Sequence, residues 1–288
     1  METIAVQNIK GGTGKTTTTI HLAAGILKAE PKARVLLIDC DQQASIKAYF
    51  RLRLQDTGAD VFDFLINGRD YRDCIQRVAL DYDEQKGGFD VMLASRRLAD
   101  AEIRLSTFPK REETLKTRFE EQNLDAVYDY VLFDCPPTLN LVTYNVLLMS
   151  KHLIIPCGMD YLSMVGVQTV LENITLIEKY FKTRPHILGI LPTFFDKRTT
   201  ISEEILEQLR KGPGQAYPIL DPIRVDTKLK NAQARKMTVF EYAHDARSAE
   251  DYAKFAAQII HTIHNKGETK YIRPAIAQPM ASSPEATV

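Results

Sequence analysis

Short runs of apolar residues alternate along the chain with longer segments in which apolar residues recur at helical spacing. The short runs predict strands at 4–9, 34–38, 89–94, 130–133, 153–156 and 187–191. The longer segments predict helices at 16–29, 165–181, 201–211 and 249–264. Buried strands that alternate with helices are typical of βαβ units. The pattern therefore predicts an α/β fold: a mostly parallel, twisted sheet with helices on both faces.

The same pattern predicts the domain organisation. The alternating segments continue without a change of composition through residues 1–264, which we predict to form a single domain. Residues 265–288 contain three prolines, many small side chains and little apolar periodicity. We predict a disordered C-terminal tail there. No apolar run approaches the roughly 20 residues that span a bilayer, and no secretory leader opens the chain, so we expect a cytoplasmic protein.

Composition narrows the choice of partners. The 37 Lys and Arg residues balance 37 Asp and Glu residues, so the formal net charge is zero. A neutral chain has no overall attraction to nucleic acid or to an anionic membrane, and any such partner must contact a local patch. Four widely spaced cysteines without a Cys-x-x-Cys pair argue against a zinc ribbon or a disulfide framework.

A glycine-rich segment joins the first predicted strand to the first predicted helix. It consists of Lys10, Gly11, Gly12, Thr13, Gly14, Lys15, Thr16 and Thr17. In such a turn the backbone N–H groups converge on phosphate oxygens, and the helix that follows adds a favourable dipole. By this interpretation Lys15 bridges the β- and γ-phosphates of a nucleotide, Thr16 ligates Mg²⁺ and Thr17 reaches the α-phosphate.

The segment departs from the usual phosphate-binding pattern at its start. Gly-x-x-x-x-Gly-Lys-[Ser/Thr] requires a glycine at position 9, where this chain has Ile9, and a second lysine, Lys10, follows. A lysine at this point lies beside the phosphates of its own nucleotide, which Lys15 already contacts. It can also reach a neighbouring molecule, or it can be a solvated surface residue.

Three carboxylates are candidates for the metal and for the attacking water. Asp39 and Asp134 each follow an apolar strand, and ligands gather at the carboxyl ends of strands in an open parallel sheet. Mg²⁺ usually keeps several waters, so we expect both side chains to hold it through water. Asp41 lies two residues after Asp39 and could orient the water that attacks the γ-phosphate. A turn or capping role is the alternative for Asp41.

The segment KGGTGKTT resembles the deviant Walker A signature of the ParA/MinD superfamily of P-loop ATPases. In that family the extra lysine crosses the interface of a nucleotide-sandwich dimer and touches the partner's phosphates. The resemblance implies that Lys10 acts in trans, as arginine fingers do. The segment 39–43, DCDQQ, resembles the family's DxDPQ with Gln42 in place of the proline. Pro136 and Pro137 resemble its second switch.

Longer stretches resemble partition ATPases of the ParA/Soj type, in the short form that starts at the first strand. They read YDYVLFDCPPTLNLVTYNVLL, HLIIPC and GILPTFFDKRTTISEEILEQLR. The resemblance implies a Mg²⁺-dependent ATPase that forms a homodimer on binding ATP and then binds nonspecific double-stranded DNA. It also implies a ParB-like activator that stimulates hydrolysis, a role in plasmid or chromosome partition and a nucleoid-associated location, with no membrane partner.

One region departs from this family and carries a local positive charge. Arg224 stands where the family has the proline of an Ile-Pro-Arg turn, and Lys236 where it has a glycine, so neither the adenine pocket nor the DNA contacts can be transferred residue by residue. Nine basic residues against five acidic ones leave a surplus of four between residues 197 and 236. Such a surplus suits DNA phosphates, although a solvated mixed-charge surface is the alternative. The basic residues are Lys197, Arg198, Arg210, Lys211, Arg224, Lys228, Lys230, Arg235 and Lys236.

Three other functions fit parts of the sequence less well. A MinD-like ATPase on a membrane requires a basic amphipathic helix, which the proline-containing tail does not provide. A redox ATPase or an iron–sulfur scaffold requires paired cysteines at a dimer interface, and here only Cys40 and Cys135 are near the expected nucleotide. A biosynthetic ligase on the same fold requires a pocket for a small carboxylate. A ligase needs that small substrate for fast turnover, whereas a partition ATPase needs DNA and a protein activator.

Overall fold

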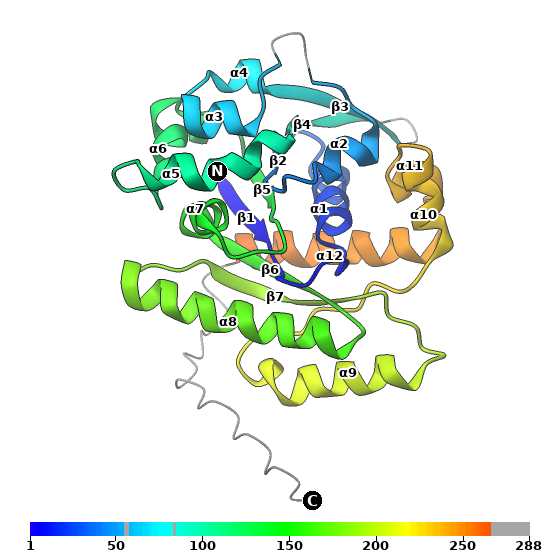
Figure 1. Ribbon diagram of the computed structural model, residues 1–288. Coiled ribbons are helices and arrows are strands. Elements are labelled where there is room, and N and C mark those ends of the chain that lie inside the picture. Colours follow the sequence, from blue (N-terminus) through cyan, green and yellow to red (C-terminus); the bar gives the residue numbers. More distant parts are fainter. Residues whose placement is uncertain (55–57, 83–84, 266–288) are drawn as a thin grey trace, which may run out of the picture.

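A computed structural model of the protein describes residues 1–54, 58–82 and 85–265 (Figure 1). Its centre is a seven-stranded sheet with the order β3-β4-β2-β5-β1-β6-β7. β3 and β4 pair antiparallel, and all other neighbouring strands are parallel. This confirms the predicted, mostly parallel sheet. The strands are β1 (Glu2–Val6), β2 (Val35–Asp39), β3 (Ile75–Tyr82), β4 (Gln85–Met92), β5 (Tyr130–Asp134), β6 (His152–Gly158) and β7 (His186–Thr193).

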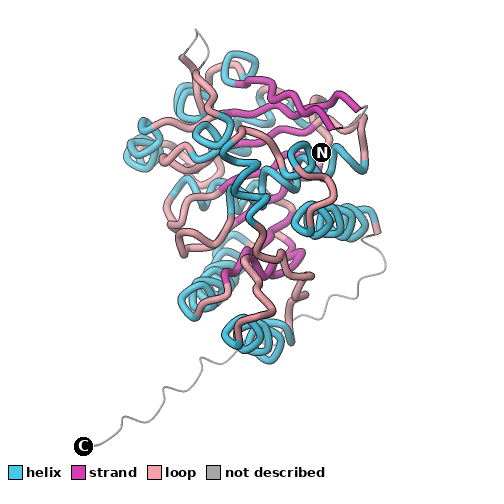
Figure 2. Tube along the Cα trace, turned by 90° about the vertical axis from the view of Figure 1, so that its right-hand side faces the viewer, coloured by secondary structure: helices cyan, strands magenta, loops and turns pink. Residues whose placement is uncertain are grey.

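Helices cover both faces of the sheet, which appears as a layer between them in Figure 2. The longer ones are α1 (Lys15–Ala29), α8 (Tyr161–Phe181), α9 (Thr200–Lys211) and α12 (Arg247–His264). The shorter ones are α2 (Ser45–Phe50), α3 (Val61–Asn67), α4 (Tyr71–Cys74), α5 (Ala101–Ser106), α6 (Thr114–Glu121), α7 (Leu141–Met149), α10 (Thr227–Ala234) and α11 (Val239–Tyr242). Three 3₁₀ turns complete the described part of the chain: η1 (Arg96–Asp100), η2 (Leu124–Ala126) and η3 (Pro213–Gln215).

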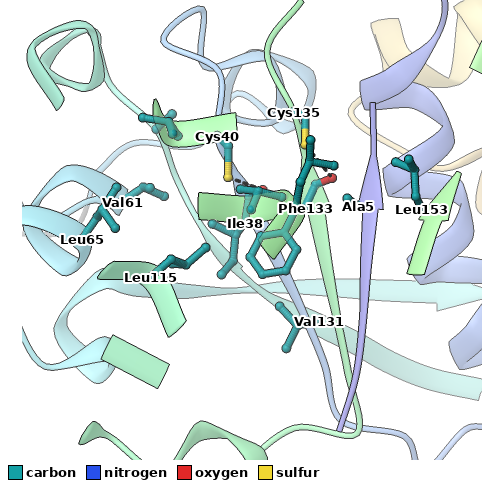
Figure 3. Close-up of a cluster of buried hydrophobic side chains, with 14 of the residues drawn as sticks. Ala5, Ile38, Cys40, Val61, Leu65, Leu115, Val131, Phe133, Cys135 and Leu153 are labelled. Carbon is teal, nitrogen blue, oxygen red and sulfur yellow. Dashed lines mark hydrogen bonds between the residues drawn. The ribbon is translucent and has the colours of Figure 1, made fainter. Parts of the chain in front are cut away.

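The central strands are buried on both sides, so their alternate side chains enter two separate cores. In β5, Val131 and Phe133 belong to a core with residues of α3, α5, α6 and α7, whereas Leu132 belongs to the core that contains residues of α1 and α12. Figure 3 shows the first two side chains together with Val61 of α3 and Leu115 of α6. Strands covered on both faces read as continuous apolar runs rather than as alternating ones. This is why YVLFD and VLLID are recognisable as strands in the sequence.

The boundaries of several elements differ from the predicted ones. β1 ends at Val6 rather than at residue 9, because Asn8 is already part of the glycine-rich loop and its side chain bonds outside the strand. α8 starts at Tyr161, four residues before the predicted start, because Asp160 caps it by accepting the Ser163 N–H at 2.9 Å. β3 and the short helices of the described chain were not predicted.

Two further expectations concern the end of the chain and membranes. Residues 266–288, which include nearly all of the predicted tail, lie outside the described residues. Within the described ranges, none of the helices combines the length and the apolar character that crossing a bilayer requires.

Candidate nucleotide-binding site

The glycine-rich loop lies at the carboxyl end of β1, between β5 and β6, and leads into α1. Gly12 has φ +78° and Gly14 has φ +85°, a left-handed backbone that glycine adopts without steric cost. A Cβ added at Gly11 or Gly12 would meet nothing within 4 Å. The backbone of the loop is therefore open to a ligand at the N-terminus of a 15-residue helix, where phosphate groups bind favourably.

Lys15 lies inside this loop. Its side chain is buried, and its Nζ donates a hydrogen bond to the Lys10 carbonyl oxygen at 3.1 Å. Burial lowers the pKa of Lys15, while the nearby Asp134 carboxylate acts in the opposite direction. Among the described residues, the ammonium group is held at the loop by one hydrogen bond to the backbone, which the oxygens of a phosphate can replace.

Thr16, Asp39 and Asp134 meet at the carboxyl ends of β2 and β5, as the sequence predicted. Thr16 Oγ1 donates a hydrogen bond to Asp134 Oδ2 at 2.6 Å, and Asp39 is paired with Asp134 in the β2–β5 register. Asp134 Oδ1 is buried and has no hydrogen-bond partner in the described part of the molecule. A buried, unpartnered carboxylate oxygen beside a hydroxyl is a fitting site for a hard cation with oxygen ligands, and Mg²⁺ is such a cation.

The protein supplies only part of a coordination shell at this place. In the described ranges, no three His, Cys, Asp or Glu side chains are grouped so that they could hold a metal ion. A Mg²⁺ ion at Thr16, Asp39 and Asp134 would therefore take its remaining ligands from phosphate oxygens and water, as this ion commonly does in nucleotide sites. The expectation that both aspartates hold the ion through water stays a prediction.

The two carboxyl groups are strongly influenced by burial. Burial, followed by the proximity of Asp134, raises the pKa of Asp39 well above its usual range. Burial raises the pKa of Asp134 to about 7, although the Thr16 hydroxyl and Lys15 lower it. The pair therefore retains a proton near neutral pH unless a cation compensates its charge.

Binding of Mg²⁺ should depend on pH for this reason. Below about pH 7 the ion must displace a proton from the Asp39–Asp134 pair, so the Mg²⁺ affinity of the complex with a non-hydrolysable ATP analogue should fall by up to about tenfold per pH unit. Calorimetric titration between pH 6 and pH 8 in two buffers would measure the affinity and the protons released. Asp134→Asn should weaken binding and reduce the pH dependence. A wild-type affinity that stays constant across this range would contradict the role of the pair.

Asp41 is half-buried at the start of the loop between β2 and α2. Its Oδ1 accepts the Gln43 N–H at 2.9 Å, and its own N–H donates to Asp39 Oδ1 at 3.2 Å. Asp41 also lies close enough to contribute electrostatically to the pKa of Lys15. Oδ2 has no hydrogen-bond partner among the described residues, so it is available for a water molecule while Oδ1 makes the turn.

The Lys10 side chain has no ion pair or hydrogen bond to any residue in the described ranges, although its backbone is firmly fixed. Its N–H donates to Asn8 Oδ1 at 2.9 Å, and Asn8 Nδ2 donates to the Pro156 carbonyl oxygen at 2.7 Å. α8 approaches closely here: a Cβ added at Gly166 would lie 2.3 Å from Asn8 Oδ1 and 3.3 Å from the Lys10 Cβ. Neither Asn8 nor Gly166 is among the residues predicted from the sequence, although a glycine isolated within a helical pattern indicates close packing.

A narrow pocket continues from the loop and was also not predicted. It is lined by residues that include Gly14, Thr17, Phe194, Ile223, Val225 and Tyr252. Phe194 is 44% exposed and has φ +58°, which is uncommon for a bulky residue. A Cβ added at Gly14 would lie 3.5 Å from Phe194 Cζ, so the ring stands directly beside the loop. An apolar and aromatic pocket at this position suits the base of a nucleotide.

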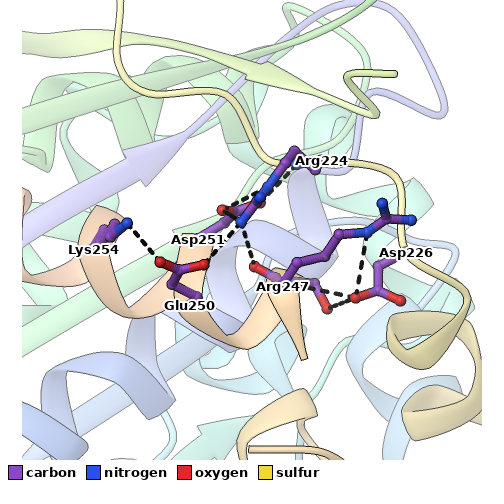
Figure 4. A network of polar contacts seen from close by, with 7 residues as sticks. Arg224, Asp226, Arg247, Glu250, Asp251 and Lys254 are labelled. Atoms are coloured by element: carbon purple, nitrogen blue, oxygen red, sulfur yellow. Dashed lines mark hydrogen bonds and ion pairs between the residues drawn. The ribbon is translucent and has the colours of Figure 1, made fainter. Parts of the chain in front are cut away.

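Arg224 holds one wall of this pocket against α12 (Figure 4). Its guanidinium donates to Asp251 at 2.6 Å and to Glu250 at 3.0 Å, and the Arg224 N–H donates to Asp251 Oδ2 at 3.0 Å. Hydrogen bonding to Asp251 raises the pKa of Arg224. The positive charge of Arg224 is therefore matched by carboxylates, and its main role is to fix the segment that carries Ile223 and Val225.

Two other members of the predicted basic surplus are also paired. Arg198 contacts Asp196 at 2.6 Å, and Lys211 contacts Glu207 at 2.7 Å. Six of the nine basic residues then have no carboxylate partner in the described part of the chain. They are Lys197, Arg210, Lys228, Lys230, Arg235 and Lys236. The free positive charge of the region lies mainly on α10 and the turn that follows it.

Comparisons of the sequence with known proteins agree with this geometry. A family model described as an AAA domain matches residues 1–187. The sporulation initiation inhibitor protein Soj of Bacillus subtilis is 33% identical over 259 residues, which cover 89% of this chain and 97% of Soj. The chromosome partitioning protein ParA of Caulobacter vibrioides is 27% identical over 261 residues, 90% of this chain and 94% of that protein.

Solved structures show the same fold. A cobyrinic acid a,c-diamide synthase from Mycobacterium smegmatis, solved with an ATP analogue and magnesium, has a TM-score of 0.76 and 26% identity over 92% of this chain and 97% of the synthase. A plasmid partition protein from Borrelia burgdorferi has a TM-score of 0.66 and 24% identity over 92% of this chain and 98% of that protein. At these identities the second likeness concerns the fold alone.

Proposed function

Because this chain belongs to the ParA family of partition ATPases, we propose that it hydrolyses ATP as a switch that controls binding to DNA. ATP binding brings two subunits together, the dimer holds nonspecific double-stranded DNA, and a ParB-like partner stimulates hydrolysis and release. The observation that carries the proposal is the Lys10 side chain. It stands at the mouth of a loop that already contains Lys15 and has no partner among the described residues.

The loop residues would hold the nucleotide. The backbone N–H groups of residues 11–14 bind phosphate oxygens, Lys15 exchanges its bond to the Lys10 carbonyl for the β- and γ-phosphates, and Thr17 contacts the α-phosphate. Thr16, Asp39 and Asp134 would hold Mg²⁺, which supplies positive charge to the phosphates when bound. Phe194 and the pocket beside it would accept the adenine base.

Hydrolysis requires a positioned water and a positive charge on the transferred phosphoryl group. Asp41 Oδ2 would accept a proton of the attacking water and orient its oxygen, while Oδ1 keeps the turn to Gln43. Lys10 of the second subunit would reach the γ-phosphate and stabilise the charge of the transition state. An isolated subunit lacks this second lysine and would hydrolyse ATP only slowly, so that assembly and turnover are coupled.

The unpaired basic residues on and around α10 would bind DNA. Contacts between Lys or Arg and phosphate are independent of base sequence, and a two-fold dimer doubles them. Because it would bind chromosomal DNA, the protein would be a cytoplasmic, nucleoid-associated ATPase. Residues 1–264 would act as one ATPase domain. The cargo could be a plasmid, a chromosome origin or a protein cluster.

Binding to DNA should depend on the nucleotide. With ATP, the protein should bind a random-sequence duplex at 0.1 M salt at least about tenfold more tightly than with ADP. A variant that binds ATP but does not hydrolyse it should show the same difference. Fluorescence anisotropy at one stated salt concentration measures this, because such affinities fall steeply with salt. Equal binding with both nucleotides, or none with either, would refute the DNA part of the proposal and leave the ATPase part standing.

A biosynthetic ligase is the second candidate, and the name of the M. smegmatis synthase is the observation that favours it. The Soj and ParA relatives match nearly the whole chain, and the former at higher identity, so we prefer the switch. Turnover separates the two. A switch should be stimulated by DNA and a ParB-like protein, whereas a ligase should be stimulated by a small carboxylate. A MinD-like ATPase would bind liposomes instead of DNA, whereas an ATPase that positions another cargo can use DNA as well.

A further inference from the structure

A second concave site lies beside the nucleotide site and has no role in the ATPase cycle proposed above. We call it the α2–η1 groove. Its walls are formed by the loop after Asp41, by α2 with the segment that follows it, and by η1. The polar residues that line it include Gln42, Gln43, Lys47, Arg51, Arg53 and Arg96. In the part of the chain that the structure describes, four cations and no carboxylate line this groove.

Among the described residues, no carboxylate pairs with the positive charges of the groove. Lys47, Arg53 and Arg96 have no ion pair or side-chain hydrogen bond to any described residue, and Arg51 Nη2 contacts only the Ala234 carbonyl oxygen, at 3.3 Å. The adjacent Arg97 shows the contrast, because it points away and contacts Asp63 at 2.6 Å. Four like charges around one hollow repel one another, and an anion that enters it relieves this repulsion.

The groove is continuous with the basic end of α10. Arg51 reaches Ala234, and the Tyr49 hydroxyl donates to the Met237 carbonyl oxygen at 3.0 Å, so α2 packs against the segment that contains Arg235 and Lys236. Figure 1 shows α2 beside α10 and α11. A row of cations, most of them guanidinium groups, fits the regularly spaced phosphates of a nucleic acid backbone better than a short acidic peptide.

We propose that the α2–η1 groove binds the phosphate backbone of nonspecific duplex DNA and so extends the DNA surface from α10 to η1. This inference rests on the proposed function, because it assigns a further part of the DNA contact to residues outside the region that the sequence analysis singled out. Lys47, Arg51 and Arg53 on the α2 wall and Arg96 on the η1 wall are expected to contact the phosphates.

The position of the groove couples DNA binding to the nucleotide site through Asp39. Asp39 Oδ2 accepts the Ile46 N–H at 3.0 Å, and Asp39 Oδ1 accepts the Asp41 N–H at 3.2 Å. The carboxylate that faces the metal site therefore holds the first turn of α2, the helix that carries Lys47 and is followed by Arg51. Any movement of Asp39 or of the loop when ATP binds changes the spacing of the cations in the groove.

The test is the salt dependence of DNA binding by the full chain with ATP. The double variant Lys47→Ala with Arg96→Ala is compared with wild type and with a matched pair, Arg104→Ala with Lys116→Ala. The matched pair removes two exposed cations from α5 and α6 that are not among the described residues lining the groove. The probe is a fluorescein-labelled random-sequence duplex of about 24 base pairs, long enough for more than two helical turns, titrated at several salt concentrations. ATP binding by each variant is measured as a control for folding.

The groove variant should bind the duplex at least about tenfold more weakly at 0.1 M salt, and the slope of log K against log salt should become shallower by about 0.9 for each phosphate that the variant no longer neutralises. The matched pair should leave both quantities unchanged. If wild type binds DNA with ATP but the groove variant keeps its affinity and slope, the groove inference is wrong and the proposed function stands. If wild type does not bind DNA, the proposed function itself fails. If the groove variant binds DNA like wild type but no longer binds a labelled Glu-rich peptide that wild type binds, the groove belongs to an acidic protein partner and the inference is overturned.

Discussion

Replacing Lys10 with alanine should lower stimulated ATP hydrolysis by about 10³- to 10⁵-fold, the range measured for charges supplied in trans to a γ-phosphate. ATP binding should change little, because Lys15 and the backbone of the loop remain in place. The Lys10 N–H bond to Asn8 is made by the backbone and survives the substitution, so the loop should keep its shape. The rate is measured with saturating DNA and a ParB-like partner, and binding with a fluorescent ATP analogue.

Lys32→Ala, which removes an exposed lysine after α1, serves as the matched control and should hydrolyse ATP like wild type. If Lys10→Ala hydrolyses ATP at the stimulated wild-type rate, Lys10 does not act on the partner's nucleotide. If Lys10→Ala no longer binds ATP, Lys10 contacts the nucleotide of its own subunit.

The second large effect is expected at Asp41. Asp41→Ala should lower hydrolysis by about 10²- to 10⁴-fold, the contribution that a positioned acid or base typically makes. In the proposed cycle, dimer formation and DNA binding need the nucleotide but not its hydrolysis, so both should persist with ATP. The variant should thus remain on DNA for much longer than wild type, which can be followed as the dissociation rate from an immobilised duplex after excess unlabelled DNA is added.

Asp41→Asn separates the two possible roles of this side chain. The asparagine carbonyl can still accept the Gln43 N–H and keep the turn, but it lacks the negative charge that accepts a proton from water. If Asp41 orients the attacking water, both variants should be slow. If Asp41 serves only the turn, Asp41→Asn should hydrolyse ATP at the wild-type rate.

The phosphate loop and the sheet could be predicted because their signals are local. Strands covered by helices on both faces appear as short apolar runs, and Gly12 and Gly14 are needed for backbone angles that other residues avoid. Asp39 and Asp134 each follow an apolar strand, and the carboxyl ends of parallel strands lie on the same side of a sheet. The register between β2 and β5 confirms that these two residues are neighbours.

Other features depend on contacts between distant segments and could not be read from the sequence. Arg224 counts as a free positive charge in the sequence, but the structure places it against Asp251, 27 residues later. Asn8 acquires its role because the fold brings the Pro156 carbonyl oxygen and Gly166 against its side chain. β3 was missed because it lies at the edge of the sheet and mixes charged with apolar residues, so its pattern does not resemble that of the central strands.

The claim that Lys10 acts on the partner's nucleotide can be tested by mixing two inactive proteins. Lys10→Ala and Asp41→Ala subunits are combined in equal amounts with ADP, so that they can exchange, and hydrolysis is then started with ATP, DNA and a ParB-like partner. In a mixed dimer the Lys10→Ala subunit keeps its own Asp41 and receives Lys10 from the other subunit. Since half of randomly formed dimers are mixed and each then has one complete site, we predict about a quarter of the wild-type rate. A mixture no faster than the two variants measured separately would show that Lys10 serves its own subunit, and would contradict the trans role of this lysine.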